Sequence, residues 1–212
     1  MSGIRIRIAD AQKDAAAVLD IYRPYIEQTA VTFEVDVPSR REFAARMEGV
    51  AGEFPYLLLE IGGELVGYAY AHQQAERAAF AWNAELSIYF KQGWQGMGLG
   101  RPLYALLMEL LTLQGYINFY GVITASNAGS ITMHEKMGFA KIGHHEKTGY
   151  KLGEWHDTVW MHKRTGGDGA PGEIVRFDAL DKKAVEARIA NACRQIESRL
   201  GASCRGYPLQ AK

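Results

Sequence analysis

One segment of this 212-residue chain combines a strand, a glycine-rich loop and a helix, and that combination limits the folds open to it. Residues 84–90 alternate apolar and polar side chains as a half-buried strand does, and residues 102–113 form an apolar helix with Pro102 near its first turn. Between them, residues 95–100 read Gln-Gly-Met-Gly-Leu-Gly. Glycines let a ligand approach the backbone closely, and the N-terminus of the following helix favours phosphate. The segment is therefore typical of a phosphate-binding loop, although an ordinary glycine turn is the simpler alternative.

Two well-known phosphate loops do not fit this segment. A dinucleotide fingerprint needs G-x-G-x-x-G in the first βαβ unit, whereas the glycines here fall as G-x-G-x-G. A P-loop ends in Gly-Lys-Ser or Gly-Lys-Thr, and the sequence Leu99-Gly100-Arg101 does not match it. The pyrophosphate loop of an acyl-CoA transferase is the third candidate, and it needs support from the rest of the chain.

The remaining elements predict a mixed α/β fold. Asp10 offers an N-cap to a first helix, and Ser39 with Glu42 forms a capping box that opens a second. Gly62-Gly63 joins two apolar strands in a hairpin. The predicted order is strand, two helices, three strands, helix, strand, helix and strands, which is no regular βαβ repeat. We divide the chain into a domain at 1–164, a glycine-rich linker at 165–175 and an extension with an amphipathic helix at 176–212.

Charge and composition exclude several classes of protein. Lys and Arg total 24 and so do Asp and Glu, so no basic excess points to nucleic acid, although the total leaves a local basic patch open. No apolar run approaches the ~18 residues that cross a bilayer, and the first residues have no signal-peptide core. Cys193 and Cys204 both lie near the end of the chain, where they cannot form a disulfide framework for a domain. We therefore expect no nucleic acid, no membrane and a cytoplasmic location.

Five motifs carry a resemblance to a known family. Gln95-x-x-Gly98-x-Gly100 resembles the coenzyme A loop of the GNAT superfamily of N-acetyltransferases, and Asn127-x-x-Ser130 with residues 134–139 resembles that family's later segment. Residues 32–34, 77–85 and 149–157 resemble the phosphinothricin N-acetyltransferase branch. The resemblance runs from about residue 4 to 163 and leaves the tail without a counterpart. It implies the GNAT acyl-CoA N-acyltransferase fold, in which a central, mostly antiparallel sheet is splayed at the coenzyme A site and flanked by helices.

Acetyl transfer from a thioester to an amine needs a base for the amine and a proton for the departing thiolate. The period of two places Glu85, Ser87 and Tyr89 on one strand face that leads to the glycine loop. The resemblance implies that Glu85 is the general base, directly or through water; otherwise it is a solvated polar residue. His134 stands where many members of the superfamily have a tyrosine, and an imidazole can move a proton either way near neutrality. A core or capping histidine is the alternative, and the choice between the two bases stays open.

The resemblance also implies the binding residues. Those expected to contact acetyl-CoA, the cosubstrate, are Ile88, Tyr89, Phe90, Gln95, Gly96, Met97, Gly98, Leu99, Gly100, Arg101, Asn127 and Ser130. Those expected around the acceptor are Phe33, Glu34, Arg77, Phe80 and Trp82. The Arg77 guanidinium suits a carboxylate on the acceptor. The alternative role for the aromatic residues is core packing, and the alternative for Asn127 is an ordinary turn asparagine. We expect no metal, because a second histidine is missing at Gly138 and H-E-x-x-H fails.

The sequence thus predicts an N-acetyltransferase that transfers acetyl directly from acetyl-CoA to the α-amine of a small amino-acid-like acceptor. Phosphinothricin, methionine sulfoximine and methionine sulfone are the acceptors that the branch implies, and the branch also implies a homodimer. The rival hypothesis is a catalytically idle acyl-CoA-binding module whose tail helix recruits a partner protein. The tail helix is expected to pack on its own core or on the second subunit.

Overall fold

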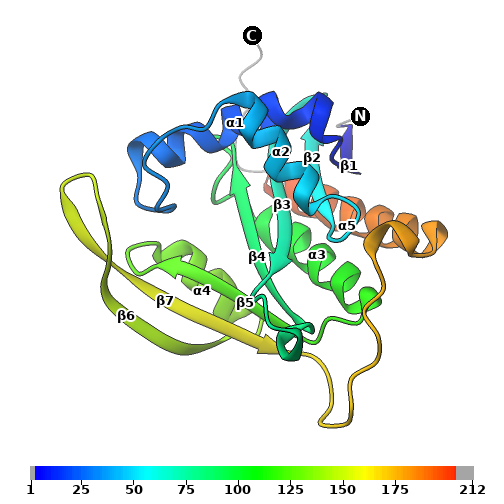
Figure 1. Ribbon diagram of the computed structural model, residues 1–212. Helices are drawn as coiled ribbons and strands as arrows, with labels where there is room; N and C mark the ends of the chain where they lie inside the picture. The colour runs from blue at the N-terminus through cyan, green and yellow to red at the C-terminus, as the bar shows by residue number, and fades with distance from the viewer. Residues whose placement is uncertain (1–2, 204–212) are drawn as a thin grey trace.

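Seven strands form one sheet, in the order β1-β2-β3-β4-β5-β7-β6, in the computed structural model, which describes residues 3–203 (Figure 1). The strands are β1 (Ile4–Ile8), β2 (Tyr56–Ile61), β3 (Glu64–Gln73), β4 (Asn83–Phe90), β5 (Asn118–Thr124), β6 (Ala140–Lys151) and β7 (Glu154–Arg164). The helices are α1 (Ala11–Gln28), α2 (Arg40–Val50), α3 (Gly100–Gln114), α4 (Ala128–Lys136) and α5 (Lys182–Ser203), with short 3-10 turns η1 (Ala78–Phe80) and η2 (Phe177–Ala179). This order confirms the mixed α/β prediction.

Local chemistry sets the start of both early helices, as the sequence predicted. The Asp10 carboxylate accepts hydrogen bonds from the backbone N–H groups of Gln12 and Lys13 at the start of α1. Ser39 and Glu42 form the reciprocal capping box at the start of α2. Gly62 and Gly63 join β2 to β3 with φ values of 62° and 83°, the conformation that a tight two-residue hairpin requires at both positions.

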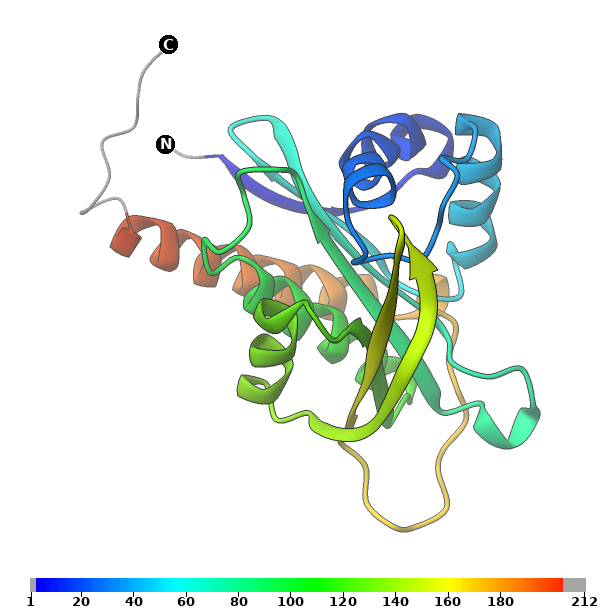
Figure 2. The ribbon, with the colours of Figure 1, turned by 90° about the vertical axis from the view of Figure 1, so that its left-hand side faces the viewer.

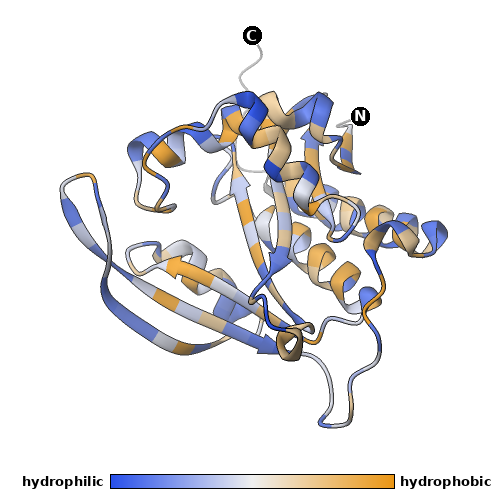
Figure 3. Cartoon of the chain, viewed as in Figure 1, coloured by the Kyte–Doolittle hydropathy of each residue, from blue (hydrophilic) through white to orange (hydrophobic). Residues whose placement is uncertain are grey.

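Helices cover both faces of the sheet. Helices α1 and α2 lie on one face and α3 and α5 on the other, as the two views of the ribbon show (Figures 1 and 2). Val18, Leu58 and Tyr68 belong to the apolar cluster under α1 and α2, whereas Leu107 and Phe119 belong to the larger cluster under α3 and α5. Apolar residues concentrate on the central strands and α3, and much of β6 is hydrophilic (Figure 3).

The sheet opens between β4 and β5, the one parallel pair among the described strands. These strands pair only where Asn83, Ala84 and Glu85 meet the first residues of β5. Beyond Glu85 the two strands separate, while β4 continues its pairing with β3 and β5 continues with β7. The predicted splay of a mostly antiparallel sheet is thereby confirmed.

The segment after β7 returns to the body of the protein and ends in α5. The indole N–H of Trp82 donates to Gly172 O at 2.7 Å, which holds that segment against the β3–β4 connection. Helix α5 then packs on α3 and β1 and buries Ala192 and Ile196. The predicted amphipathic helix is therefore present on its own core, whereas the division into domains stays a prediction and Cys204 lies outside the described residues. No helix within residues 3–203 is long and apolar enough to cross a membrane.

Candidate active site

Two adjoining hollows occupy the opening between β4 and β5. The first is a narrow cavity of about 60 Å³ lined by both strands, by Tyr104 of α3 and by His134 of α4. The second is a cleft of about 570 Å³ lined by the glycine loop, by the first turn of α3 and by α4. Ile88, Asn127 and Ser130 line both. A long ligand can therefore lie in the cleft with one end in the narrow cavity.

His134 is held in one tautomer inside the narrow cavity. Its Nδ1–H donates to the backbone oxygen of Ser130 at 2.8 Å, because a carbonyl oxygen only accepts. The neutral ring therefore has a bare Nε2, which accepts a hydrogen bond from the Tyr104 hydroxyl at 2.9 Å. The imidazole is only 3% exposed, and this burial lowers the pKa of His134 below its ordinary value of 6.5. The ring is thus neutral at pH 7 and bonded to a fully buried tyrosine.

Backbone space fixes where this ring lies. Gly121 of β5 faces His134, and a Cβ built on Gly121 would lie 2.7 Å from Nε2. On its other sides, the ring centroid is 5.0 Å from that of Tyr104 and 4.9 Å from that of Phe139. Three neighbours therefore enclose the imidazole and limit its movement.

Glu85 stands where β4 and β5 separate. It is the last β4 residue that pairs with β5, opposite Tyr120, and it pairs with His72 on β3. Its side chain is 23% exposed, with His72 Nε2 3.9 Å from the carboxylate. Burial raises the pKa of Glu85, an effect that His72 partly offsets. A carboxylate with a raised pKa accepts a proton more readily, which suits a general base.

The backbone of β4 alternates between its two neighbours beyond Glu85. Lys91 N–H donates to Val66 O on the β3 side, whereas Phe90 O accepts a hydrogen bond from the Tyr25 hydroxyl. Leu86 O likewise lies on the other side, 3.4 Å from the oxygen of Tyr104, whose proton is directed to His134. Ile88 lies between Leu86 and Phe90, so its N–H and C=O point into the gap beside β5. That edge can pair with an extended ligand that carries amide groups.

The glycine loop has the conformation that its sequence predicts. Gly93, Gly96 and Gly98 adopt φ values of 87°, 75° and 76°, which residues with a Cβ rarely take. Leu99, whose apolar side chain cannot cap, occupies the N-cap position of α3. The free N–H groups of this first turn, together with the positive end of the helix dipole, therefore face the cleft. The geometry suits a pyrophosphate group.

The predicted coenzyme A residues lie together around these hollows. Those that line the larger cleft are Ile88, Phe90, Gln95, Gly96, Gly98, Leu99, Gly100, Arg101, Asn127 and Ser130. Tyr89 lines the narrow cavity instead, and Met97 lies in the loop, partly exposed, outside both linings. Two have structural partners of their own: the Gln95 amide donates to Tyr25 OH at 3.0 Å, and Asn127 Oδ1 accepts from Ser130 N–H at 3.1 Å as the cap of α4.

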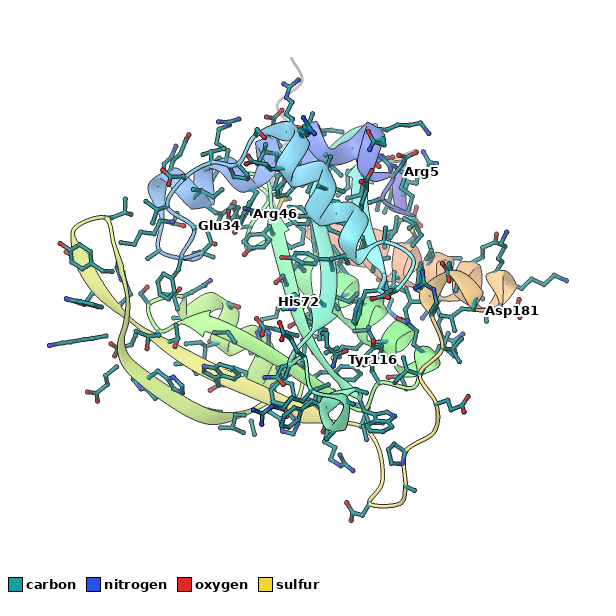
Figure 4. All side chains as sticks on the ribbon, viewed as in Figure 1. Arg5, Glu34, Arg46, His72, Tyr116 and Asp181 are labelled. Atoms are coloured by element: carbon teal, nitrogen blue, oxygen red, sulfur yellow. The ribbon has the colours of Figure 1, made fainter. Side chains whose placement is uncertain are left out.

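The five predicted acceptor residues do not come together. Glu34, which lies beside Arg46 (Figure 4), accepts a hydrogen bond from Arg46 Nη1 at 2.8 Å. Both residues line a cavity of about 140 Å³ under α1 and α2. The Phe33 ring lies against Gly149 of β6. In contrast, Arg77, Phe80 and Trp82 belong to the β3–β4 connection and line none of these three hollows. Their role in acceptor binding stays a prediction.

Sequence reasoning missed Tyr104 and Gly121. Tyr104 lies in an apolar helix, where its ring is expected only to pack, and nothing local marks its bond to His134. Gly121 carried a usable signal, because a glycine inside a strand often marks the close approach of another group. Within residues 3–203, no three His, Cys, Asp or Glu side chains gather as metal ligands would.

Comparisons with known proteins agree with this geometry. The sequence profile of the family described as "Acetyltransferase (GNAT) domain" matches residues 6–160. A phosphinothricin N-acetyltransferase from Streptomyces viridochromogenes is 35% identical over 160 residues, which cover 76% of this chain and 87% of that protein. An L-methionine sulfoximine/L-methionine sulfone acetyltransferase from Salmonella typhimurium is 30% identical over 169 residues, covering 78% and 97%.

A solved structure shows the same likeness in three dimensions. The phosphinothricin acetyltransferase of Sinorhizobium meliloti, in complex with AcCoA, superposes with a TM-score of 0.77 at 32% identity, covering 84% of this chain and 97% of that one. The splayed sheet, the glycine loop and the family match point to one identity. The chain belongs to the GNAT family, in its phosphinothricin N-acetyltransferase-like branch, and is an acetyl-CoA-dependent N-acetyltransferase.

Proposed function

We propose that this enzyme transfers acetyl directly from acetyl-CoA to the α-amine of a small amino-acid-like acceptor of the phosphinothricin, methionine sulfoximine or methionine sulfone type. The observation that carries the proposal is the opening between β4 and β5, with Glu85 at its apex and Tyr104 and His134 in its wall. A thioester held along the Ile88 edge would place its carbonyl near these groups. The two cysteines of the chain lie far from the opening in sequence, so no acyl-enzyme step is invoked.

Glu85 is the base in this proposal. An α-amine arrives mostly as an ammonium ion near neutral pH, and Glu85 takes one proton from it, directly or through water. The nitrogen then bonds to the thioester carbonyl carbon, and the C–S bond breaks. The raised pKa of Glu85 supports this role, because a carboxylate of ordinary pKa would be a weaker base.

Tyr104 and His134 move the second proton from nitrogen to sulfur. Tyr104 can accept that proton while its own hydroxyl proton passes to His134 Nε2, 2.9 Å away. The bond from Nδ1–H to Ser130 O remains in place as the ring becomes positive. Burial lowers the pKa of His134, so the ring returns the proton rather than keeping it, and the reverse shift delivers it to the leaving thiolate.

The acceptor class rests on the named relatives and on the charges of the α1–α2 side. A small amino-acid acceptor presents both a carboxylate and an ammonium group, and the partly exposed ion pair between Arg46 and Glu34 offers one charge of each sign to them. The test compares kcat/KM for phosphinothricin, methionine sulfoximine and methionine sulfone with that for a lysine-containing peptide and a polyamine. We expect one of the three small acceptors to lead by tenfold or more. A tenfold preference for the peptide or the polyamine would overturn the acceptor class but not the acetyltransferase activity.

We also propose that the enzyme is a homodimer joined through the β6–β7 hairpin, which projects from the body (Figure 1). Tyr150, Leu152 and Trp155 near its turn are each 59% exposed, an unusual cost for a monomer in water. Sedimentation equilibrium should give twice the monomer mass, and Trp155→Asp should shift it toward the monomer. A monomeric wild-type protein would refute the proposal. The expected cytoplasmic location stays a prediction, which cell fractionation tests.

The rival hypothesis, an idle binding module with a recruiting tail, has less support. Helix α5 buries Ile196 against its own core, so its apolar face is not free for a partner protein. Release of free coenzyme A in the presence of the acceptor panel separates the two hypotheses, because an idle module binds acetyl-CoA without turnover.

A further inference from the structure

A fourth hollow lies beside the glycine loop, and three of the residues that line it carry a positive charge. This cation pocket, of about 250 Å³, lies between α3, α5 and the end of β7, and its charged residues are Arg101, Lys163 and Arg199. Arg101 also lines the large cleft described above. The two hollows therefore lie next to each other, with Arg101 in the lining of both.

Arg199 reaches this place from outside the family domain. It belongs to α5, whereas the family match ends at residue 160. A Cβ built on Gly98 would lie 3.9 Å from Arg199 Nη1, so the guanidinium approaches the glycine loop itself. In Figure 2 the loop between β4 and α3 runs beside the C-terminal half of α5. Ile196, one turn earlier and fully buried, fixes the helix in this position.

Within residues 3–203, no ion pair neutralises the positive charge of the cation pocket. Among the ion pairs of the described residues, none includes Arg101, Lys163 or Arg199. Lys163 has one partner, Met137 O, to which its amine donates at 2.6 Å. Lys136, which lines the cleft, adds a fourth cation nearby. In a chain whose formal net charge is zero, such a local concentration lowers the energy of a bound anion.

We propose that the cation pocket binds the 3′-phosphate of acetyl-CoA and that Arg199 is a ligand-binding residue supplied by the C-terminal helix. This inference rests on the placement of acetyl-CoA in the cleft. With the thioester in the narrow cavity and the pyrophosphate at the glycine loop, the part of the cosubstrate that continues past Arg101 is the adenosine 3′-phosphate. A phosphate monoester carries nearly two negative charges at pH 7 and matches the fork of an arginine.

The test compares two ligands that differ only in this phosphate. Calorimetry gives the Kd of coenzyme A and of 3′-dephospho-coenzyme A for the full-length wild type, for Arg199→Gln and for the matched control Arg194→Gln. Arg194 is also an exposed arginine of α5 but does not line the pocket. We expect Arg199→Gln to raise the Kd of coenzyme A about tenfold, which corresponds to about 1.4 kcal/mol of binding free energy. We expect the same variant to bind 3′-dephospho-coenzyme A with unchanged Kd, and Arg194→Gln to leave the Kd of both ligands unchanged. Arg199→Lys should partly restore the affinity for coenzyme A.

Three results would overturn the inference. An equal loss toward both ligands would assign Arg199 to the pyrophosphate or to folding, which thermal unfolding separates. No loss toward either ligand would remove Arg199 from binding. The pocket would instead be assigned to a free anion if two results came together. These are equal wild-type affinity for the two coenzymes, and stabilisation by inorganic phosphate that is lost in Arg199→Gln. Failure of the wild type to bind any coenzyme A would instead refute the proposed function.

Discussion

A methyl group added to β5 tests whether the position of His134 determines turnover. In Gly121→Ala the new Cβ would lie 2.7 Å from His134 Nε2, whereas ordinary contact begins at about 3.4 Å. The imidazole must therefore withdraw by roughly 0.7 Å, although Tyr104 and Phe139 enclose it. Such a shift strains the 2.9 Å bond to Tyr104. We expect a loss of about 1–3 kcal/mol in the free energy of unfolding and a roughly 10²-fold lower kcat.

The assay measures coenzyme A release at saturating acetyl-CoA and acceptor, with urea unfolding and the Kd of acetyl-CoA on the same samples. Gly143→Ala is the matched control, because it adds the same methyl to a strand at 3.6 Å from the nearest heavy atom, in ordinary contact. A folded Gly121→Ala enzyme with wild-type kcat would refute the reasoning. A loss of acetyl-CoA affinity as large as the loss of kcat would also refute it, because the methyl would then be blocking the cavity.

Three single substitutions test the general base, the glycine loop and the packing of α5. Glu85→Gln should lower kcat roughly 10²-fold while acetyl-CoA affinity holds. Because burial raises the folded-state pKa of Glu85, wild-type stability falls as pH rises from 4.5 through that pKa. The variant should therefore resist urea better than the wild type at pH 8, and equal stabilities would contradict this. Gly98→Val should abolish acetyl-CoA binding, since φ of 76° disfavours a β-branched residue; unchanged calorimetry on folded protein would exclude the phosphate-loop role. Ile196→Ala should cost about 2–5 kcal/mol of stability with little change in kcat, and an unaltered melting temperature would mean that α5 is not docked.

Elements were predictable from the sequence where local chemistry determines them. Asp10, Ser39 and the Gly62-Gly63 turn fix helix starts and a hairpin through contacts a few residues away, so their patterns are visible in the chain itself. The alternation of β4 was equally local, and Tyr89 indeed packs toward α1 while Phe90 packs toward α3. The splay between β4 and β5 was expected only through the family resemblance, because strand separation is decided by the whole sheet.

Side-chain partnerships across elements were not predictable. The bond between Tyr104 and His134 depends on how α3 and α4 lie against the same edge, which no spacing in the sequence records. The same holds for Arg46 beside Glu34 and for Arg199 beside the glycine loop. The acceptor residues show the converse, because Arg77 and Glu34 were grouped by motif while the fold places them in separate regions.

The packing of α5 on β1 also affects the time at which the protein completes its fold. During synthesis β1 and α3 leave the ribosome well before α5, so the apolar surface that Ile196 covers stays open until translation has passed the family domain. Closing a contact over so long a stretch of chain is slow compared with forming the β2–β3 hairpin. A nascent chain halted before α5 would therefore expose the apolar surface that Ile196 otherwise covers, and it would be a substrate for chaperones.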